Sequence, residues 1–180
     1  MELQSLPVPR ADRRRLLRLN DEAFPREERI PSRILLPFLR HHGCETMAAY
    51  DGEFIGFVSV LPMPQLKMAY IWYLAVESPV RSRGYGAQIL RALVPRYPGW
   101  QLVVDMERPD PHAGNNAQRL RRIAFYERCG YSRTGYGMRY FDVDYEILAR
   151  GEFRCDDFDV LLLKMWGRKL KPELTPLSAR

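Results

Sequence analysis

The segment RSRGYG, from Arg81 to Gly86, places two glycines behind two arginines. It separates YIWYLAVESPV, which is typical of a strand, from AQILRALV, which is typical of a helix. The first amides of a helix have no partner within the helix, and the helix dipole adds partial positive charge there. Glycine permits positive φ angles and a close approach of a ligand to the backbone. The segment therefore indicates a phosphate site, with an ordinary tight turn as the alternative.

The spacing of this loop differs from that of two common phosphate-binding motifs. The GxxxxGK[ST] pattern of P-loop proteins is absent, and so is the GxGxxG pattern of dinucleotide-binding domains. The pattern present is Arg-x-x-Gly-x-Gly. The sequence therefore predicts neither of those two nucleotide-binding domains.

A second segment that can carry chemistry, RRIAFYERCGY, begins about 40 residues after the first. It places Tyr126 on a helix that ends at Gly130, where glycine suits the left-handed residue that terminates helices. A phenol hydroxyl can give a proton to a leaving group. The alternative is that Tyr126 is a half-buried aromatic residue without chemistry, and its neighbour Phe125 is expected in the core.

Together the two segments resemble the GNAT superfamily of acetyl-CoA-dependent N-acetyltransferases. In that family a strand, loop and helix carry [Q/R]-x-x-G-x-[G/A], which residues 81–86 match. A later helix carries a sequence similar to A-x-x-FYE-x-x-GF, which residues 125–131 match. The resemblance covers roughly residues 10–150, and the two motifs occur in the order and at the spacing of the family.

This resemblance implies an enzyme that transfers an acetyl group from acetyl-CoA to an amine of a small molecule or peptide. The amine would attack the thioester directly, without a metal. The alternative of another class is a catalytically silent acyl-CoA-binding module with a regulatory role. The presence of Tyr126 favours the enzyme, because a module that only binds has no need of an acid at the sulfur.

The resemblance also implies roles for individual residues. Tyr126 would be the general acid that protonates the departing CoA thiolate. Backbone groups of Leu74 and Val76 would hydrogen-bond the pantetheine arm as an added strand does. The pyrophosphate would be held by the amides of Arg81, Ser82, Arg83, Gly84, Tyr85, Gly86 and Ala87.

Two positions depart from the family pattern. Many members have asparagine seven residues before the tyrosine, where this chain has Arg119, and alanine three residues later, where it has Arg122. Asn115 and Asn116 lie further upstream. The sequence leaves open whether these asparagines or Arg119 contact CoA.

The amine must lose a proton, so a base or a chain of water molecules is required. Glu107 ends the strand WQLVVDME, next to the place where the family's fold brings the reacting groups together. Asp105 lies two residues earlier on the same face, so we expect one carboxylate to raise the pKa of the other. One interpretation makes Glu107 the base or an amine-binding group. The other pairs it with an arginine such as Arg108 or Arg122.

The segment FPREERIP, residues 24–31, borders the acceptor groove in relatives of the resembled family. Glu27 and Glu28 are therefore candidates for contact with a cationic substrate. The alternative is a solvated acidic turn opposite the arginine-rich first helix. The acceptor itself is not identified by the sequence.

The composition favours a folded protein outside the membrane. Of the 180 residues, 46% are hydrophobic and 12% aromatic, which excludes a disordered chain. The apolar runs are far shorter than the roughly 20 residues of a membrane span, and the first residues lack a secretory signal pattern. Three widely separated cysteines and three histidines form no zinc spacing. We expect a cytoplasmic protein that binds no metal and no membrane.

A net charge of +6 favours an anionic partner. The run RADRRRLLR, residues 10–18, has two interpretations, a nucleic-acid patch or one solvated face of an amphipathic helix. No nucleic-acid recognition module supports the first, so we expect no nucleic-acid partner. Acetyl-CoA is an anionic partner of the kind that this net charge favours. The oligomeric state stays open, a homodimer included.

The remaining patterns predict a mixed α/β domain. Helices are expected at about 11–22 and before Gly43, and a hairpin at Asp51-Gly52. A strand, the glycine loop, a helix and another strand form a βαβ unit with parallel strands. A helix, an antiparallel pair and a closing helix behind an Asp cap follow. Residues 1–180 thus form one GNAT-like domain, with a mostly antiparallel central sheet that splays at its parallel pair and is flanked by helices. Its core spans about 10–150, and 151–180 form a closing helix and tail.

Overall fold

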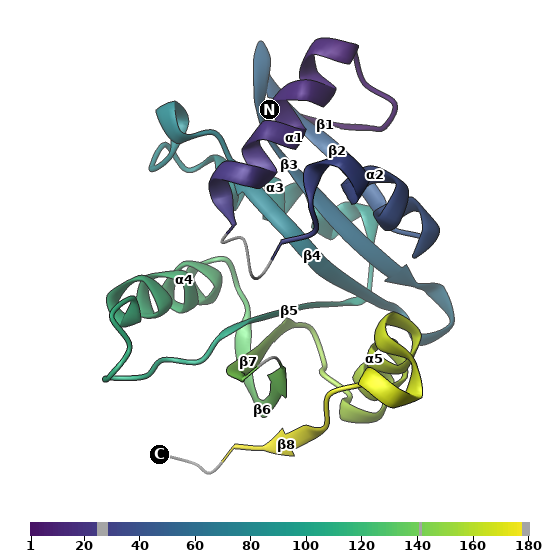
Figure 1. Ribbon diagram of the computed structural model, residues 1–180, viewed down its shortest axis with the longest axis vertical. Helices are drawn as coiled ribbons and strands as arrows, with labels where there is room; N and C mark the ends of the chain where they lie inside the picture. Colours follow the sequence, from purple (N-terminus) through teal and green to yellow (C-terminus); the bar gives the residue numbers. More distant parts are fainter. Residues whose placement is uncertain (25–28, 141, 178–180) are drawn as a thin grey trace. The chain divides into compact units, whose positions relative to one another are not determined.

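The computed structural model describes residues 1–24, 29–140 and 142–177. They divide into two compact units. The first comprises Met1–Pro62 and Tyr70–Pro98, and the second comprises Met63–Ala69 and Gly99–Arg180. Figure 1 shows the helices and strands of both with their labels.

Four strands in the order β1-β2-β3-β4 form the sheet of the first unit. The antiparallel β2–β3 hairpin turns at Gly52, whose φ of 75° suits glycine, so the predicted Asp51-Gly52 hairpin is confirmed. The strand β1, which also pairs antiparallel with β2, was not expected from the sequence. The bounds are β1 Glu2–Ser5, β2 Glu45–Asp51, β3 Glu53–Met63 and β4 Met68–Val76.

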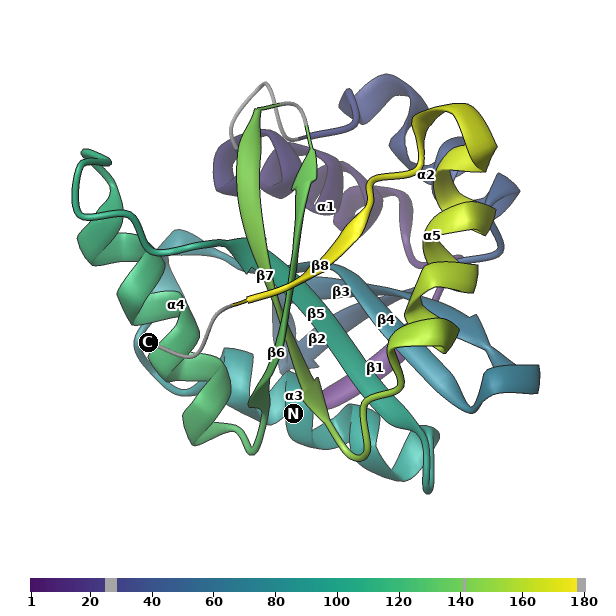
Figure 2. The same ribbon diagram turned by 90° about the horizontal axis from the view of Figure 1, so that it is seen from below.

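Two helices cover one face of this sheet and a third lies on the opposite face (Figures 1 and 2). The first two, α1 Arg10–Ala23 and α2 Ser32–His41, match the predicted helices. The third, α3 Tyr85–Leu93, follows the glycine loop. The leucines of α1 and α2 recur at helical spacing and pack on strand residues, which buries one core of Leu16, Leu19, Leu35, Leu39, Ala48, Phe54, Phe57, Tyr73 and Ala75.

The second unit has four strands in the order β5-β7-β6-β8. Each neighbouring pair is antiparallel. One helix lies on each side of these strands (Figure 2). The bounds are β5 Gln101–Glu107, α4 Asn116–Arg128, β6 Ser132–Tyr140, β7 Val143–Arg150, α5 Cys155–Leu170 and β8 Leu174–Pro176. Short 3-10 turns lie at η1 Pro64–Leu66, η2 Ser78–Val80 and η3 Val94–Arg96.

The predicted mixed α/β class with a mostly antiparallel sheet is confirmed, and two details are corrected. The strand β8 was not expected, because three residues that include a proline carry little strand signal and such a strand is tolerated at a sheet edge. The Asp cap of α5 is wrong. Its N-cap is Arg154, and Asp156 and Asp157 lie in the first turn, where the helix dipole favours negative charge. A single domain with a core at about 10–150 stays a prediction.

Among the described residues no helix is both long and apolar enough to cross a membrane.

Candidate active site

The predicted phosphate loop connects β4 to α3 in the first unit. Its residues 81–84 are exposed, and both Ser82 and Gly84 have positive φ angles, 64° and 84°. Left-handed residues alternating with ordinary ones turn successive amides toward one side, which is an arrangement that binds anions. Gly84 is also the N-cap of α3, and no side chain of the described part of the protein caps that end. The loop therefore leaves its amides to a ligand, except that of Arg81, which donates to the carbonyl of Ser78 at 3.3 Å.

The first turn of α3 extends this set of amides. The first backbone N–H to bond within the helix is that of Gln88, which donates to the carbonyl of Gly84 at 3.1 Å. The amides of Tyr85, Gly86 and Ala87 come before it and have no partner within the helix. Of the predicted pyrophosphate residues, the six from Ser82 to Ala87 thus offer consecutive N–H groups at a helix N-terminus with its partial positive charge.

Side chains hold this loop at both ends. Arg81 Nε donates to the carbonyl of Val76 at 2.9 Å, so this guanidinium is turned back onto the end of β4. The hydroxyl of Tyr85 donates to Asp51 Oδ2 at 2.7 Å, and this bond is the main cause that lowers the pKa of Asp51. Arg83 is exposed and has no ion pair within the described ranges. It is the cation of the loop that is left to an incoming anion.

An ion pair beneath the loop joins it to α1. Arg15 donates to both carboxylate oxygens of Glu77, at 3.0 and 2.5 Å, and to the carbonyl of Phe54 at 2.9 Å. The side chain of Arg15 is 29% exposed and that of Glu77 is 18% exposed. The hydrogen bond to Glu77 is the main cause that raises the pKa of Arg15. Glu77 directly precedes η2, so this pair anchors the start of the phosphate loop.

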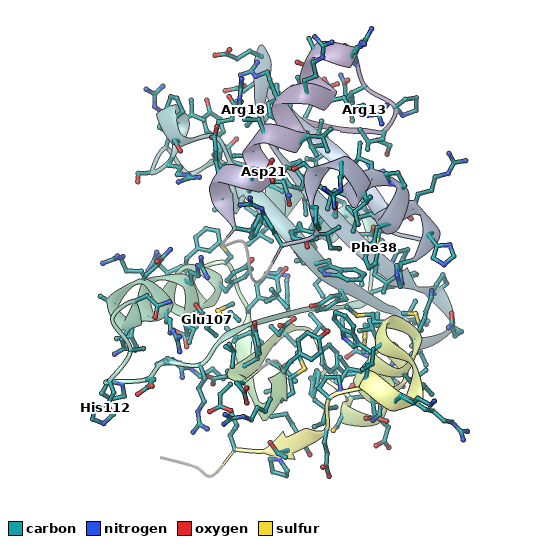
Figure 3. The ribbon with its side chains drawn as sticks, in the orientation of Figure 1. Arg13, Arg18, Asp21, Phe38, Glu107 and His112 are labelled. Carbon is teal, nitrogen blue, oxygen red and sulfur yellow. The ribbon has the colours of Figure 1, made fainter. Side chains whose placement is uncertain are left out.

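We expect Arg15→Met to lower the free energy of unfolding by about 1–2 kcal/mol, because it leaves the carboxylate of Glu77 without its bidentate partner. It also weakens acetyl-CoA binding, since the loop loses its anchor. Urea unfolding and calorimetry measure the two effects. The control is Arg18→Met on the same helix (Figure 3), whose exposed pair with Glu22 contributes only about 0.3–0.5 kcal/mol. Equal losses in both variants would contradict the anchoring role.

The predicted pantetheine contacts lie at the end of β4. Leu74 and Val76 are half-buried, and the residues between and after them are engaged with β3. The amide of Glu77 donates to the carbonyl of Ile55, and a Cβ on Gly56 would lie 2.3 Å from the carbonyl oxygen of Ala75. Because backbone groups alternate direction along a strand, those of Leu74 and Val76 face away from β3. One of them, the carbonyl of Val76, already accepts from Arg81.

Tyr126 lies in the C-terminal half of α4 in the second unit and is 9% exposed. Its ring makes edge contacts with the rings of Phe125 and Tyr131, at centroid distances of 5.1 and 5.3 Å. Burial, which is the main cause, raises the pKa of its hydroxyl above the ordinary value. The phenol therefore keeps its proton through neutral pH and above, as a general acid must.

The neighbour of Tyr126 corrects one expectation. Phe125 is half-buried rather than part of the core. The buried positions of α4 are Ile123 and Tyr126, which are three residues apart and share one face. Phe125 lies beside that face. The helix ends as predicted, at Gly130 with a φ of 86°.

Glu107 is buried at the end of β5, next to α4 (Figure 3). It accepts hydrogen bonds from Arg119 Nη2 at 2.8 Å and from Asn115 Nδ2 at 3.1 Å. Arg122 Nη1 lies 3.8 Å from Oε2 of the same carboxylate. Both carboxylate oxygens are thus engaged by donors of α4 and its N-cap. This geometry corresponds to the ion-paired interpretation, with Arg119 rather than Arg108 as the principal partner.

The guanidinium of Arg119 donates hydrogen bonds to three groups of the protein itself. Its Nε donates to Asn115 Oδ1 at 2.8 Å and its Nη1 to the carbonyl of Arg108 at 2.9 Å, while Nη2 binds Glu107. Asn116 Oδ1 accepts from the amide of Asp110 at 2.9 Å. The residue in the position of the family's asparagine therefore ties the end of β5 to the start of α4.

We expect Glu107→Gln to lower the free energy of unfolding by about 1–3 kcal/mol and kcat by less than tenfold, because the half-buried Arg119 loses the charge of its partner. Arg119→Met is the matched variant. Since the two side chains form one contact, the effects of the double variant are smaller than the sum of the single effects. A stable Glu107→Gln protein with kcat lowered a hundredfold would instead assign the base to Glu107.

The remaining predicted site residues are Glu27, Glu28 and Asp105. Glu27 and Glu28 lie outside the described residues. Asp105 is half-buried, and its charge contributes to the raised pKa of Tyr126. The described ranges contain no group of three or more histidine, cysteine or carboxylate side chains that could hold a metal ion. The contacts of Arg15 with Glu77 and of Asn115 with Glu107 were not expected. The partners lie 62 and 8 positions apart in the sequence, and no local pattern joins them.

The sequence model of the acetyltransferase (GNAT) family matches residues 13–131 of the chain. No curated protein is significantly similar to it in sequence. Among solved structures, one described as an acetyltransferase of the GNAT family from Bacteroides thetaiotaomicron is 21% identical, with a TM-score of 0.70. That comparison covers 96% of this chain and 100% of the other.

Two further solved structures are similar at low identity. An aminoglycoside 6'-N-acetyltransferase complexed with coenzyme A is 18% identical, with a TM-score of 0.64 over 83% of this chain and 96% of that one. The ribosomal-protein-S18-alanine N-acetyltransferase of Escherichia coli is 16% identical, with a TM-score of 0.59 over 86% of this chain and 98% of that one. At these identities the structures establish a shared fold and no shared substrate.

Proposed function

Because the chain belongs to the acetyltransferase (GNAT) family, we propose that it transfers an acetyl group from acetyl-CoA to a primary amine of a small molecule or peptide. The observation that carries the proposal is the exposed loop at residues 81–84, whose amides continue into the uncapped first turn of α3. Such a set of donors is suited to a pyrophosphate. A similar solved structure, the aminoglycoside enzyme, contains coenzyme A.

In this proposal the diphosphate of acetyl-CoA binds the amides of residues 82–87, with Arg83 as an additional cation, because the amide of Arg81 donates to Ser78. The outward-facing backbone of Leu74 and the amide of Val76 hydrogen-bond the pantetheine arm. Arg81 stabilises the end of β4 rather than the phosphate, since its Nε donates to the carbonyl of Val76. The cofactor is a co-substrate, and the chemistry needs no metal.

The transfer itself is direct. The amine nitrogen attacks the thioester carbonyl, a carbon–nitrogen bond forms, and the carbon–sulfur bond breaks. The amine gives up one proton, and the CoA thiolate takes one up. We assign the second proton to Tyr126, on the resemblance of its motif and on the raised pKa of its buried hydroxyl.

In this scheme the contacts of Glu107 favour a positioning role over that of the base. Its two oxygens accept from Arg119 and Asn115, which fixes the start of α4 relative to the end of β5. A proton is then taken from the amine by a water molecule or by the solvent. Glu107 as the general base remains a prediction, which the Glu107→Gln variant tests.

The acceptor is an amine, and the similar structures include enzymes named for an aminoglycoside and for the alanine of a ribosomal protein. The experiment that tests the function mixes the protein with acetyl-CoA and a panel of small amines and peptides. Release of CoA thiol is followed with a thiol reagent, and the acetylated product by mass spectrometry. Transfer to at least one amine is expected. Tight binding of acetyl-CoA with no transfer to any amine would instead favour the silent binding module.

A further inference from the structure

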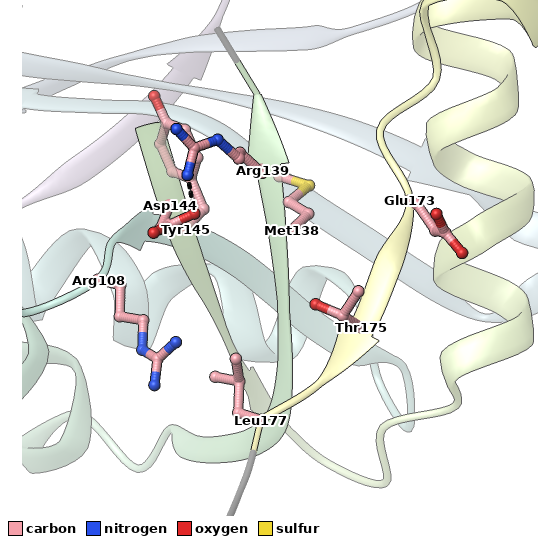
Figure 4. Close-up of a pocket in the computed structure, with 8 residues that line it drawn as sticks. All are labelled: Arg108, Met138, Arg139, Asp144, Tyr145, Glu173, Thr175 and Leu177. Carbon is pink, nitrogen blue, oxygen red and sulfur yellow. Dashed lines mark ion pairs between the residues drawn. The ribbon is translucent and has the colours of Figure 1, made fainter. Parts of the chain in front are cut away.

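Two neighbouring cavities in the second unit share Arg108 and Asp144. The first has a volume of about 210 Å³ and is lined by Arg108, Met138, Arg139, Asp144, Tyr145, Glu173, Thr175 and Leu177 (Figure 4). The second, of about 410 Å³, is formed by the residues after β5 and the start of β7. Because ligand sites for drug-sized molecules span about 300–1,000 Å³, the first cavity suits a smaller molecule.

Two of the four charged side chains that line the first cavity, Arg139 and Asp144, pair with each other. Arg139 lies 3.4 Å from Asp142 and 3.6 Å from Asp144, and Figure 4 marks the second of these pairs. In the second cavity, Asp110 accepts from the amide of His112, and Arg119 binds Glu107. These side chains therefore have partners within the protein.

Two charges of the first cavity have no partner within the described part of the chain. One is the guanidinium of Arg108, which is half-buried, and the other is the carboxylate of Glu173, which is exposed. Both backbone polar groups of Arg108 are hydrogen-bonded. Its amide donates to the carbonyl of Asp144 at 2.7 Å, and its carbonyl accepts from Arg119. In the view of Figure 4, Thr175 and Leu177 are drawn between the two.

We propose that this cavity binds a small molecule that carries both a carboxylate and an ammonium group. The carboxylate binds Arg108 through paired N–H donors. The amine is held near Glu173, while Met138 and Leu177 contact the carbon chain. This proposal does not rest on the proposed acetyl transfer.

The chemistry of the cavity favours this class over a simple anion or a simple amine. An anion alone would meet Arg108 but also the unpaired carboxylate of Glu173. An amine alone would leave the half-buried Arg108 uncompensated. A molecule with both charges gives the guanidinium of Arg108 an anion and the carboxylate of Glu173 a cation. Charge-assisted hydrogen bonds of this kind are roughly twice as strong as neutral ones.

The test uses a series of aminocarboxylates without acetyl-CoA: glycine, β-alanine, 4-aminobutyrate and 6-aminohexanoate. Because the series varies the separation of the two charges, one length binds best. Binding is measured by chemical-shift changes in the NMR spectrum of the full chain. Butylamine and butyrate, which carry one charge each, bind at least tenfold more weakly than the best member. Equal binding of the single-charge compounds would overturn the proposal, and so would no binding of the whole series.

Variants then assign the contacts. Arg108→Met and Glu173→Gln each weaken binding of the best aminocarboxylate at least tenfold, while Arg168→Met, which removes an exposed cation of α5, does not change it. Melting temperatures confirm that each variant is folded. Unchanged binding in both Arg108→Met and Glu173→Gln would overturn the site.

Discussion

Gly84→Glu abolishes measurable binding of acetyl-CoA. Gly84 has a φ of 84°, in the left-handed region, where a residue with a side chain costs about 1–2 kcal/mol. It is also the N-cap of α3, so a carboxylate there competes with the diphosphate for the amides of the first turn and repels it. Because each 1.4 kcal/mol is a factor of ten in affinity, the two effects together remove binding. Isothermal titration calorimetry with acetyl-CoA measures the loss.

Two controls separate strain from charge. Gly84→Ala carries the strain alone, and because the space around a Cβ there is open, it weakens binding only about tenfold. Gly43→Glu introduces the same charge at a glycine with a similar φ of 80° and equally open surroundings, outside the loop. It leaves the affinity for acetyl-CoA unchanged. Full binding by the Gly84→Glu protein would refute the assignment of the loop.

The second large effect is expected from Tyr126→Phe, which lowers kcat by about 10²–10⁴-fold. The dissociation constant for acetyl-CoA changes less than twofold, because the ring and its packing are kept. Steady-state kinetics with the acceptor found in the amine screen, together with calorimetry, measure the two constants. Since burial raises the pKa of the Tyr126 hydroxyl, the proton stays bound as the pH rises from 7 to 9. The wild-type rate should therefore not fall over that range through ionisation of Tyr126.

Tyr131→Phe is the matched control for the loss of a hydroxyl. Tyr131 is 3% exposed, contacts the ring of Tyr126, and its hydroxyl has no hydrogen-bond partner within the described residues. Removing an unpaired buried hydroxyl leaves stability unchanged or higher. The kcat of this variant should equal that of the wild type. If Tyr126→Phe also retains full activity, the acid is not Tyr126.

Sequence alone was sufficient where short stretches of backbone decide the structure. The hairpin at Gly52, the loop at Gly84 and the helix end at Gly130 all depend on one residue that tolerates a positive φ. Local apolar spacing likewise identified α1, α3 and α5. The shorter strands β1 and β8 were missed, because an edge strand of three or four residues is stabilised by its neighbour rather than by its own pattern.

The candidate site was predictable only in part, since its motifs are local and its supporting contacts are not. Residues 81–87 and Tyr126 were identified from segments that match a family pattern. The ion pair of Arg15 with Glu77 joins α1 to the end of β4, and nothing in either segment indicates it. Glu107 was recognised as a candidate, but whether it is a base or a paired carboxylate depended on Arg119 reaching it from α4.

What the sequence by itself determined is therefore the family, the mixed α/β class and the backbone of the phosphate loop. These follow from residue type and from spacing along the chain. Only the tertiary structure decided which charges are neutralised and which are left for a ligand. The strand β8 brings Glu173 into a cavity with Arg108, and α4 supplies the donors that occupy Glu107. Such choices depend on distances of a few ångströms between side chains far apart in sequence, because the energy of two charges is decided by their separation and by the solvent between them.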